Sequence, residues 1–189
     1  MKDTFNVYTT VCELLMDRGY KLSKLVSIDE FSVMYEENNY DIIDVESKIY
    51  CSFFTDNKTF GKKDLEGTVS RLKEKYGETI KILVILKTKP NVIIEKELTN
   101  EYYKDVEIFL FANLTFNITH HNDMPKFVPL SQKEMTDVIN LYKTNKNQFP
   151  KMLETDPVAR YYGVKSGGMF KIIRQSPSAG EYITYRYVK

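Results

Sequence analysis

The spacing of apolar side chains divides the first 112 residues into alternating helices and strands. Apolar residues first recur at helical spacing, at Val7, Tyr8, Val11, Leu14 and Leu15. This spacing predicts a helix over residues 4–18 that stops at Gly19. Ser27 and Glu30 then form a capping-box pattern, in which each side chain accepts a hydrogen bond from the other residue's backbone N–H. A short helix through Tyr35 is expected to follow.

Branched and aromatic residues predict a series of short strands. We expect strands over residues 40–45, 48–54, 80–86 and 106–111. The third of these runs is almost entirely apolar, which is typical of a strand buried on both faces. A helix over residues 62–76 is predicted by one apolar face, formed by Leu65, Val69, Leu72 and Tyr76. Residues 92–99 fit either a helix or a strand.

The last third of the chain predicts two helices. Ser131 and Glu134 form a second capping box. The helix that follows is expected to bury Met135, Val138, Ile139 and Tyr142. A shorter helix is predicted after Asp156, which is a good N-cap. Pro157 suits its first position, where the missing N–H of proline costs nothing. Gly163 can adopt the left-handed conformation that ends it.

A β-hairpin is predicted at the C-terminus. Residues 169–175 and 181–188 fit two strands, and residues 176–180 fit the loop between them. In the second strand one face carries Ile183, Tyr185 and Tyr187, and the other carries Tyr182, Thr184, Arg186 and Val188. Neither face is polar enough for solvent on its own. We therefore expect one face to cover the module's own helices and the other to meet a partner, since tyrosine and arginine are favoured at interfaces. A strand covered entirely within the chain is the alternative.

The order of elements indicates an α/β fold, or α+β over the whole chain. The 189 residues suit one large domain or two small ones, and the 42% of hydrophobic residues suffices for a core. The net charge of +1 does not favour a free-standing nucleic-acid binder. The charge is unevenly distributed, because residues 143–189 contain nine lysines and arginines but three acidic residues. This asymmetry fits a module that docks on partners, or a solvated basic surface.

Cysteine content and hydropathy favour a soluble intracellular protein. Cys12 and Cys51 lie in apolar surroundings without metal-ligand spacing, so we expect buried free thiols. There is no signal-peptide core and no apolar run of about 20 residues. His120 and His121, the two histidines of the chain, have no nucleophile or ligand set near them in sequence. No cofactor and no metal site is predicted.

One group of residues raises the alternative of a free-standing nuclease-like enzyme. Asp41, Asp44, Glu46 and Lys48 form a D-x-x-D-x-E-x-K pattern. Nucleases of the restriction-endonuclease class hold Mg²⁺ with such carboxylates, and a lysine orients the attacking water. In an extended strand Asp44, Glu46 and Lys48 share one face. The same pattern also fits a solvated strand edge.

The C-terminal residues resemble a known family. The segment DPVARYYGVKSGGMFKIIRQSPSAGEYITYR (156–186) resembles the C-terminal signature of the fifth subunit of eukaryotic RNA polymerases, which has a shorter archaeal counterpart without a jaw domain. Residues 117–120, Met124-Pro125, Leu130-Ser131 and residues 148–150 extend this resemblance. Residues 11–20 are similar to the opening of the eukaryotic family's N-terminal jaw domain. The resemblance is strong over about the last 70 residues and loose over the first third.

The resemblance implies a fold, a function and partners. It implies a nuclease-like α/β jaw domain over 1–116, a connecting segment over 117–130, and a small mixed α/β assembly domain over 131–189 that resembles the archaeal counterpart. The chain would be a non-catalytic subunit of a multisubunit DNA-directed RNA polymerase, active in transcription. Its assembly domain would dock on the largest subunit, and its jaw would lie near downstream DNA and bind it weakly by itself. The nucleus is the family location; a protein encoded by a large DNA virus would act in the cytoplasm and the virion.

Eleven residues in the family-like stretches are candidates for the interface. They come from the short helix, the turn after it and the hairpin: Asp156, Pro157, Arg160, Tyr161, Lys165, Lys171, Arg174, Ser178, Gly180, Tyr185 and Arg186. Among these residue types, arginine is suited to paired or stacked contacts because of its planar guanidinium group.

Overall fold

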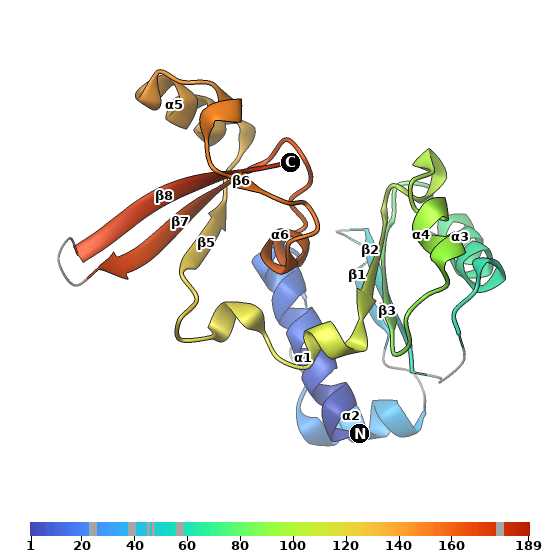
Figure 1. Ribbon diagram of the computed structural model, residues 1–189. Helices are drawn as coiled ribbons and strands as arrows, with labels where there is room; N and C mark the ends of the chain where they lie inside the picture. Colours follow the sequence, from blue (N-terminus) through green and yellow to red (C-terminus); the bar gives the residue numbers. More distant parts are fainter. Residues whose placement is uncertain (23–25, 38–40, 45, 47, 56–58, 177–179) are drawn as a thin grey trace. The chain divides into compact units, whose positions relative to one another are not determined.

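The computed structural model describes residues 1–22, 26–37, 41–44, 46, 48–55, 59–176 and 180–189 (Figure 1). It divides the chain into two compact units, Met1–Phe116 and Asn117–Lys189. Each unit has a four-stranded sheet with helices packed on it, so the predicted α/β character, α+β overall, is confirmed. No helix in these ranges is long and apolar enough to cross a membrane.

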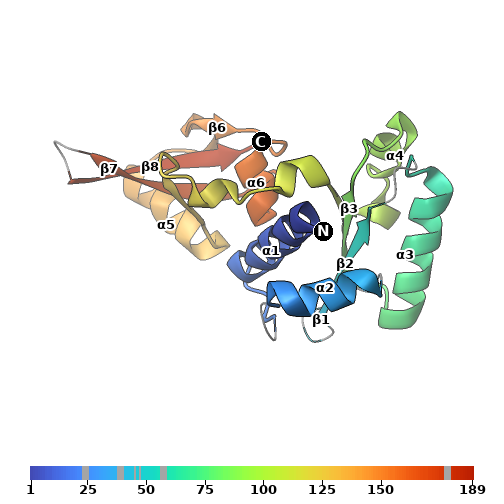
Figure 2. The ribbon, with the colours of Figure 1, turned by 90° about the horizontal axis from the view of Figure 1, so that it is seen from below.

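The first unit is a mixed sheet between two layers of helices (Figure 2). Its strands are β1 (Ile42–Asp44), β2 (Ile49–Phe54), β3 (Lys81–Leu86) and β4 (Val106–Leu110), paired in that order. The β1–β2 pair is antiparallel, and the other two pairs are parallel. Its helices are α1 (Lys2–Asp17), α2 (Ile28–Glu36), α3 (Lys62–Tyr76) and α4 (Val92–Glu97), with 3₁₀ turns at Glu101–Tyr103 and Phe111–Leu114.

Strand β3 lies at the centre of this unit, as its apolar sequence predicts. Its residues after Lys81 are all buried. Ile82, Val84 and Leu86 belong to one core cluster together with the apolar face of α3 and with Ile94 of α4. The segment 92–99, which fits a helix or a strand, forms α4, and the Asn91 side chain caps it by accepting a hydrogen bond from the N–H of Ile93.

An ion pair connects the end of α1 to β4. The guanidinium of Arg18 donates two hydrogen bonds to the Glu107 carboxylate, at 3.2 and 2.8 Å. The Arg18 side chain is almost completely buried. Bidentate pairs of this kind are the stronger form of charged hydrogen bond. Cys12 and Cys51 are buried free thiols, as predicted.

The second unit is a small sheet with two helices. Its strands β5 (Lys126–Pro129), β6 (Lys151–Met152), β7 (Met169–Ser176) and β8 (Gly180–Val188) follow the order β5-β7-β8-β6. The pair of β6 with β8 is parallel, and the other two pairs are antiparallel. The helices are α5 (Gln132–Tyr142) and α6 (Pro157–Tyr162), with 3₁₀ turns at Ile118–His120 and Lys146–Gln148.

The core of the second unit lies between the sheet and α6. Phe170, Ile172 and Val188 of the hairpin pack with Val158 and Ala159 of α6. Ile118, Met124 and Phe127, from the segment before α5, also pack against this core. The two strands β5 and β6 are too short to produce an alternating pattern, and the sequence does not predict them.

The predicted apolar face of α5 is covered only in part. Ser131 and Glu134 form the expected capping box, with Glu134 N–H donating to Ser131 Oγ at 3.3 Å and Ser131 N–H donating to Glu134 Oε2 at 2.8 Å. Met135, Val138 and Ile139 are half-buried, but none of the helix residues is fully buried, and Tyr142 is 54% exposed. Periodicity identifies the apolar face of a helix but not what covers it.

The domain boundaries stay a prediction, which truncation tests. Segment 117–130, expected to be a connection, contributes β5 and the Phe127 ring, whose centroid lies 5.8 Å from that of Phe170. We expect a chain of residues 117–189 to unfold cooperatively by circular dichroism. A chain of residues 131–189 should be less stable by about 2–5 kcal/mol, the range for losing large apolar side chains. Equal stability of the two chains would contradict a structural role for β5.

We also predict that alkaline pH destabilises the first unit. Burial raises the pKa of Tyr8 from 10.0 to about 12 and that of Cys12 from 9.0 to about 11. Both groups therefore hold their protons more tightly when folded, so their contribution is complete below about pH 9 and is lost as pH rises to 12. The melting temperature should fall over this range, and less steeply in Tyr8→Phe. Tyr182→Phe, which removes an exposed hydroxyl, is the control and should follow the unchanged protein.

Candidate functional site

Helix α6 supports the first group of candidate interface residues. The Asp156 carboxylate accepts a hydrogen bond from Val158 N–H at 2.9 Å, and Pro157 occupies the first turn, as predicted. Gly163 ends the helix with φ 65°, a conformation that costs glycine little. The carboxylate of Asp156 is thus used locally as a cap. Pro157 is exposed. Arg160 is half-buried and already interacts with other residues of the chain.

Tyr161 is part of the interior of the second unit. It is 3% exposed, and its hydroxyl accepts a hydrogen bond from Asn117 Nδ2 at 2.9 Å. The family-like Asn117 and the family-like Tyr161 therefore meet, although 44 positions separate them. The geometry gives both residues a structural role inside the unit.

The hairpin of β7 and β8 changes from buried to exposed along its length. At the chain's end Tyr187 and Val188, on opposite faces, are both buried. Toward the loop Tyr182 and Ile183, also on opposite faces, are 56% and 39% exposed. The expected contrast between one covered face and one open face is therefore replaced by a contrast between a covered end and an open end. Near the loop, both faces of the hairpin are exposed to solvent.

The remaining candidate residues lie on the hairpin or on the turn before it. Lys165 is exposed in that turn, and Lys171 is half-buried on β7. Arg174, Gly180 and Arg186 are exposed on the hairpin. Tyr185 is half-buried, and Ser178 lies outside the described residues. No ion pair joins Arg186 to Asp156 among the residues with described positions, so nothing there holds this arginine to its own cap. The interface assignment of all eleven residues stays a prediction.

An aromatic cluster joins the hairpin to the end of α5. Tyr142, Phe149 and Tyr185 are in mutual edge contact, with ring centroids 5.8–6.3 Å apart. Burial, and secondarily the neighbouring Tyr142, raises the pKa of Tyr185 above its usual value. The cluster borders a groove of about 450 Å³ that continues along residues 182–185. Sequence reasoning missed this groove, although Phe149-Pro150 and Tyr185 lie in the family-like stretches.

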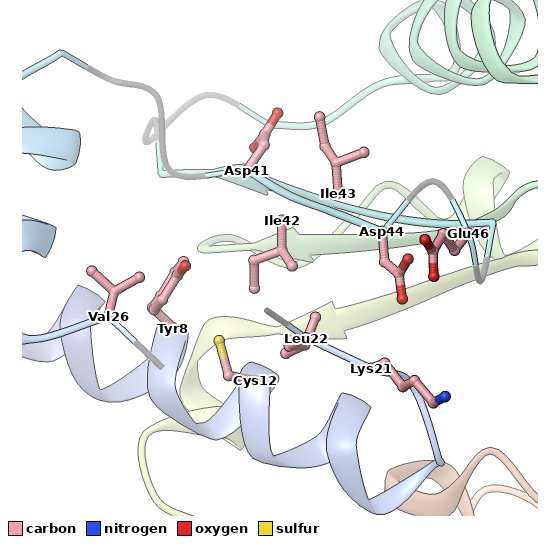
Figure 3. A pocket seen from close by; sticks show the side chains of 10 residues that line it. All are labelled: Tyr8, Cys12, Lys21, Leu22, Val26, Asp41, Ile42, Ile43, Asp44 and Glu46. Atoms are coloured by element: carbon pink, nitrogen blue, oxygen red, sulfur yellow. The ribbon is translucent and has the colours of Figure 1, made fainter. Parts of the chain in front are cut away.

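The nuclease hypothesis requires Asp44, Glu46 and Lys48 to act together, and the structure does not assemble them. Figure 3 shows Asp44 and Glu46 pointing to the same side of the chain, into a pocket of about 490 Å³ that they line together with Lys21. Lys48 does not line this pocket. Its Nζ donates a hydrogen bond to Thr79 Oγ1 at 3.1 Å, and its φ of 53° interrupts the extended backbone on which a shared face depends.

Asp41, the first carboxylate of the pattern, has a structural role. It accepts hydrogen bonds from Tyr50 Oη at 2.6 Å, from Phe53 N–H at 3.1 Å and from Ser52 Oγ at 3.4 Å. Burial, and then the hydrogen bond to Asp41, raises the pKa of Tyr50. In the described residues no three histidine, cysteine or acidic side chains gather as metal ligands do.

Comparison with known proteins supports the resemblance. Residues 116–188 match the family described as RNA polymerase Rpb5, C-terminal domain. A protein of Dictyostelium discoideum named DNA-directed RNA polymerases I, II, and III subunit rpabc1 is 31% identical over 94% of this chain and 92% of its own length. The chain belongs to the Rpb5 family. The C-terminal match covers the second unit, and the longer alignment includes the first unit as well.

A second Rpb5 relative shows the same extent of similarity. The Caenorhabditis elegans protein named DNA-directed RNA polymerases I, II, and III subunit RPABC1 is 28% identical over 97% of this chain and 94% of its own length. The family predicted from residues 156–186 is thus confirmed. The nuclease alternative has no support from these relatives, whose names describe polymerase subunits.

We predict that the isolated protein has no Mg²⁺-dependent nuclease activity. Lys48 is directed to Thr79, so the lysine of the E-x-K pattern does not line the pocket of Asp44 and Glu46. The measurement is incubation of plasmid DNA with the purified protein and Mg²⁺, with Glu46→Ala as the matched variant. Cleavage by the unchanged protein that disappears in Glu46→Ala would contradict this conclusion.

Proposed function

We propose that this Rpb5-family chain is a non-catalytic subunit of a multisubunit DNA-directed RNA polymerase. The observation that carries the proposal is the similarity to shared polymerase subunits over more than nine-tenths of the chain and of the relatives. The position of Lys48, which bonds Thr79 and does not line the pocket of Asp44 and Glu46, agrees with it. The nucleus is the corresponding location for a cellular protein of this family.

The second unit is the part that we propose to dock on the largest polymerase subunit. It carries 11 lysines and arginines and 6 aspartates and glutamates, whereas the first unit carries 16 and 20. The open end of the hairpin adds exposed apolar and basic side chains, including Tyr182 and Arg174. Aromatic and arginine side chains are the residue types that contribute most to interfaces.

We place the first unit near the downstream DNA of the transcribing enzyme. Its excess of acidic residues gives little counterion release on contact with phosphates, so its own affinity for duplex DNA is weak and non-specific. DNA contact would then depend on the polymerase holding the unit in place, as multivalent attachment allows.

Affinity purification tests the proposed function. The tagged protein, expressed in its own cell type, should recover a stoichiometric set of polymerase subunits identifiable by mass spectrometry. Recovery of the tagged protein without any polymerase subunit would overturn the assignment.

Arg186→Ala tests the docking surface. Arg186 is exposed in the isolated chain. Asp156, a carboxylate that could have held it within the unit, caps α6 instead. We expect the variant to lose about 2 kcal/mol or more of binding free energy in the polymerase, the scale of an interface hot spot, and to keep its melting temperature. Arg71→Ala, on the exposed side of α3, is the matched control and should assemble normally. A large fall in melting temperature with normal assembly would assign Arg186 to the fold instead.

A further inference from the structure

The sheet of the second unit has an open edge because Pro150, directly before β6, cannot extend the pairing of β6 with β8. Strand β6 runs parallel to β8, and Tyr187 N–H donates to the Pro150 carbonyl at 2.9 Å. In a parallel ladder the next bond toward the hairpin loop would run from the N–H of residue 150 to the carbonyl of Tyr185. Proline has no N–H. The pairing of β6 with β8 therefore ends at this position.

Beyond Pro150 the outer edge of β8 has no neighbouring strand within the described ranges. Val188 N–H donates to the Gly168 carbonyl on the β7 side, so the backbone groups of alternate residues 186, 184 and 182 also face β7. The N–H and carbonyl groups of Glu181 and Ile183, and the carbonyl of Tyr185, consequently point to the open side. Figure 1 shows the hairpin extending well past β6.

The side chains along this edge suit an added strand. The groove of about 450 Å³ runs beside residues 182–185 and ends at Tyr142, Phe149 and Pro150. Natural sheet edges are usually protected by lysine, proline or a bulge in the strand. Residues 182–185 contain none of these, and Tyr182 and Ile183 are exposed. An unprotected apolar edge of this kind is a template for pairing with another chain.

Charge indicates what kind of segment fits. Lys143 and Lys146 are exposed just before Phe149, and the Lys146 ammonium lies 5.8 Å from the ring centroid of Tyr187. The second unit as a whole carries five more basic than acidic residues. Two positively charged copies repel each other, whereas an acidic segment is attracted.

We propose that the open edge of β8 binds an extended acidic peptide segment of a partner protein, which adds as a fifth strand beside residues 181–185. Its backbone pairs with Glu181, Ile183 and Tyr185, and an apolar side chain enters the groove that the Tyr142, Phe149 and Tyr185 cluster borders. Strand addition of this kind takes its affinity from main-chain hydrogen bonds and its specificity from alternate side chains. The inference concerns any polypeptide partner and does not depend on assembly into a polymerase.

A peptide titration of the full chain tests the proposal. The probe is a blocked ten-residue peptide that alternates valine and glutamate, followed through the backbone amide resonances of the protein. The expected shifts centre on Glu181, Ile183 and Tyr185. The same peptide methylated on the backbone nitrogens of one edge should bind about 10-fold more weakly, since it cannot donate the pairing hydrogen bonds. A peptide alternating valine and lysine should also bind about 10-fold more weakly.

Two substitutions at one position separate backbone pairing from side-chain contact. Ile183→Pro removes an N–H that faces the open side and leaves the ladder with β7 intact. Ile183→Ala also removes the isoleucine side chain but keeps the backbone N–H. We expect Ile183→Pro to bind the acidic peptide about 10-fold more weakly than Ile183→Ala. If Ile183→Pro fails to fold, the methylated peptide on the unchanged protein decides the question.

Three results would overturn the proposal. The first is equal binding of the methylated and unmethylated peptides, and the second is equal binding of the acidic and the basic peptide. The third is a dimer of the free protein, seen by sedimentation, that Ile183→Pro abolishes and that excludes the peptide, because the edge would then be occupied by a second copy of the chain.

Discussion

The second unit depends on hydrogen bonds made by the last three residues of the chain. Tyr187 N–H donates to Pro150, Val188 N–H donates to Gly168, and Lys189 N–H donates to Met152. The Val188 side chain is completely buried. These bonds connect the end of the chain to β6 and the residue before it, and to the residue before β7, which are far apart in sequence. A unit of this size has a small core, so a few such connections decide its stability.

The same connections leave the other end of the hairpin open. Tyr187 and Val188 pair on both sides, while residues 181–185 pair with β7 and have no second strand beside them in the described part of the chain. Pro150 sets the boundary between the two regions because it accepts a hydrogen bond and cannot donate one. The open end combines exposed Tyr182 and Ile183 with Arg174 and Arg186 nearby in the strands. This is why the proposed contacts of the unit concentrate there.

The glycines after α6 have different physical roles. Gly163 adopts the left-handed conformation that ends the helix. At Gly168 a Cβ atom would lie 2.4 Å from Val164 Cγ1 and 3.3 Å from the Lys165 carbonyl oxygen. A larger residue at position 168 would therefore force this turn, to which Val188 of β8 is hydrogen-bonded, to shift. The turn thus contributes to closing the unit.

The sequence by itself determined the main helices, the apolar β3, both serine capping boxes and the final hairpin. These features depend on local patterns: helical periodicity, continuous apolar runs, and serine–glutamate spacing. It also determined the family, because residues 156–186 retain a long and nearly uninterrupted motif. None of these conclusions required knowing which segments are neighbours in space.

Tertiary structure decided the rest, since it depends on contacts between distant segments. Strands β5 and β6 have four and two residues, too few for a periodic signal, and they form because β7 and β8 supply partners. Periodicity found the apolar face of α5 but could not reveal that it is only half-buried. Asp44, Glu46 and Lys48 form one group in the sequence pattern, but the lysine is directed to Thr79, 31 positions away. Side-chain spacing along a chain specifies a shared face only while the backbone stays extended, and at Lys48 it does not.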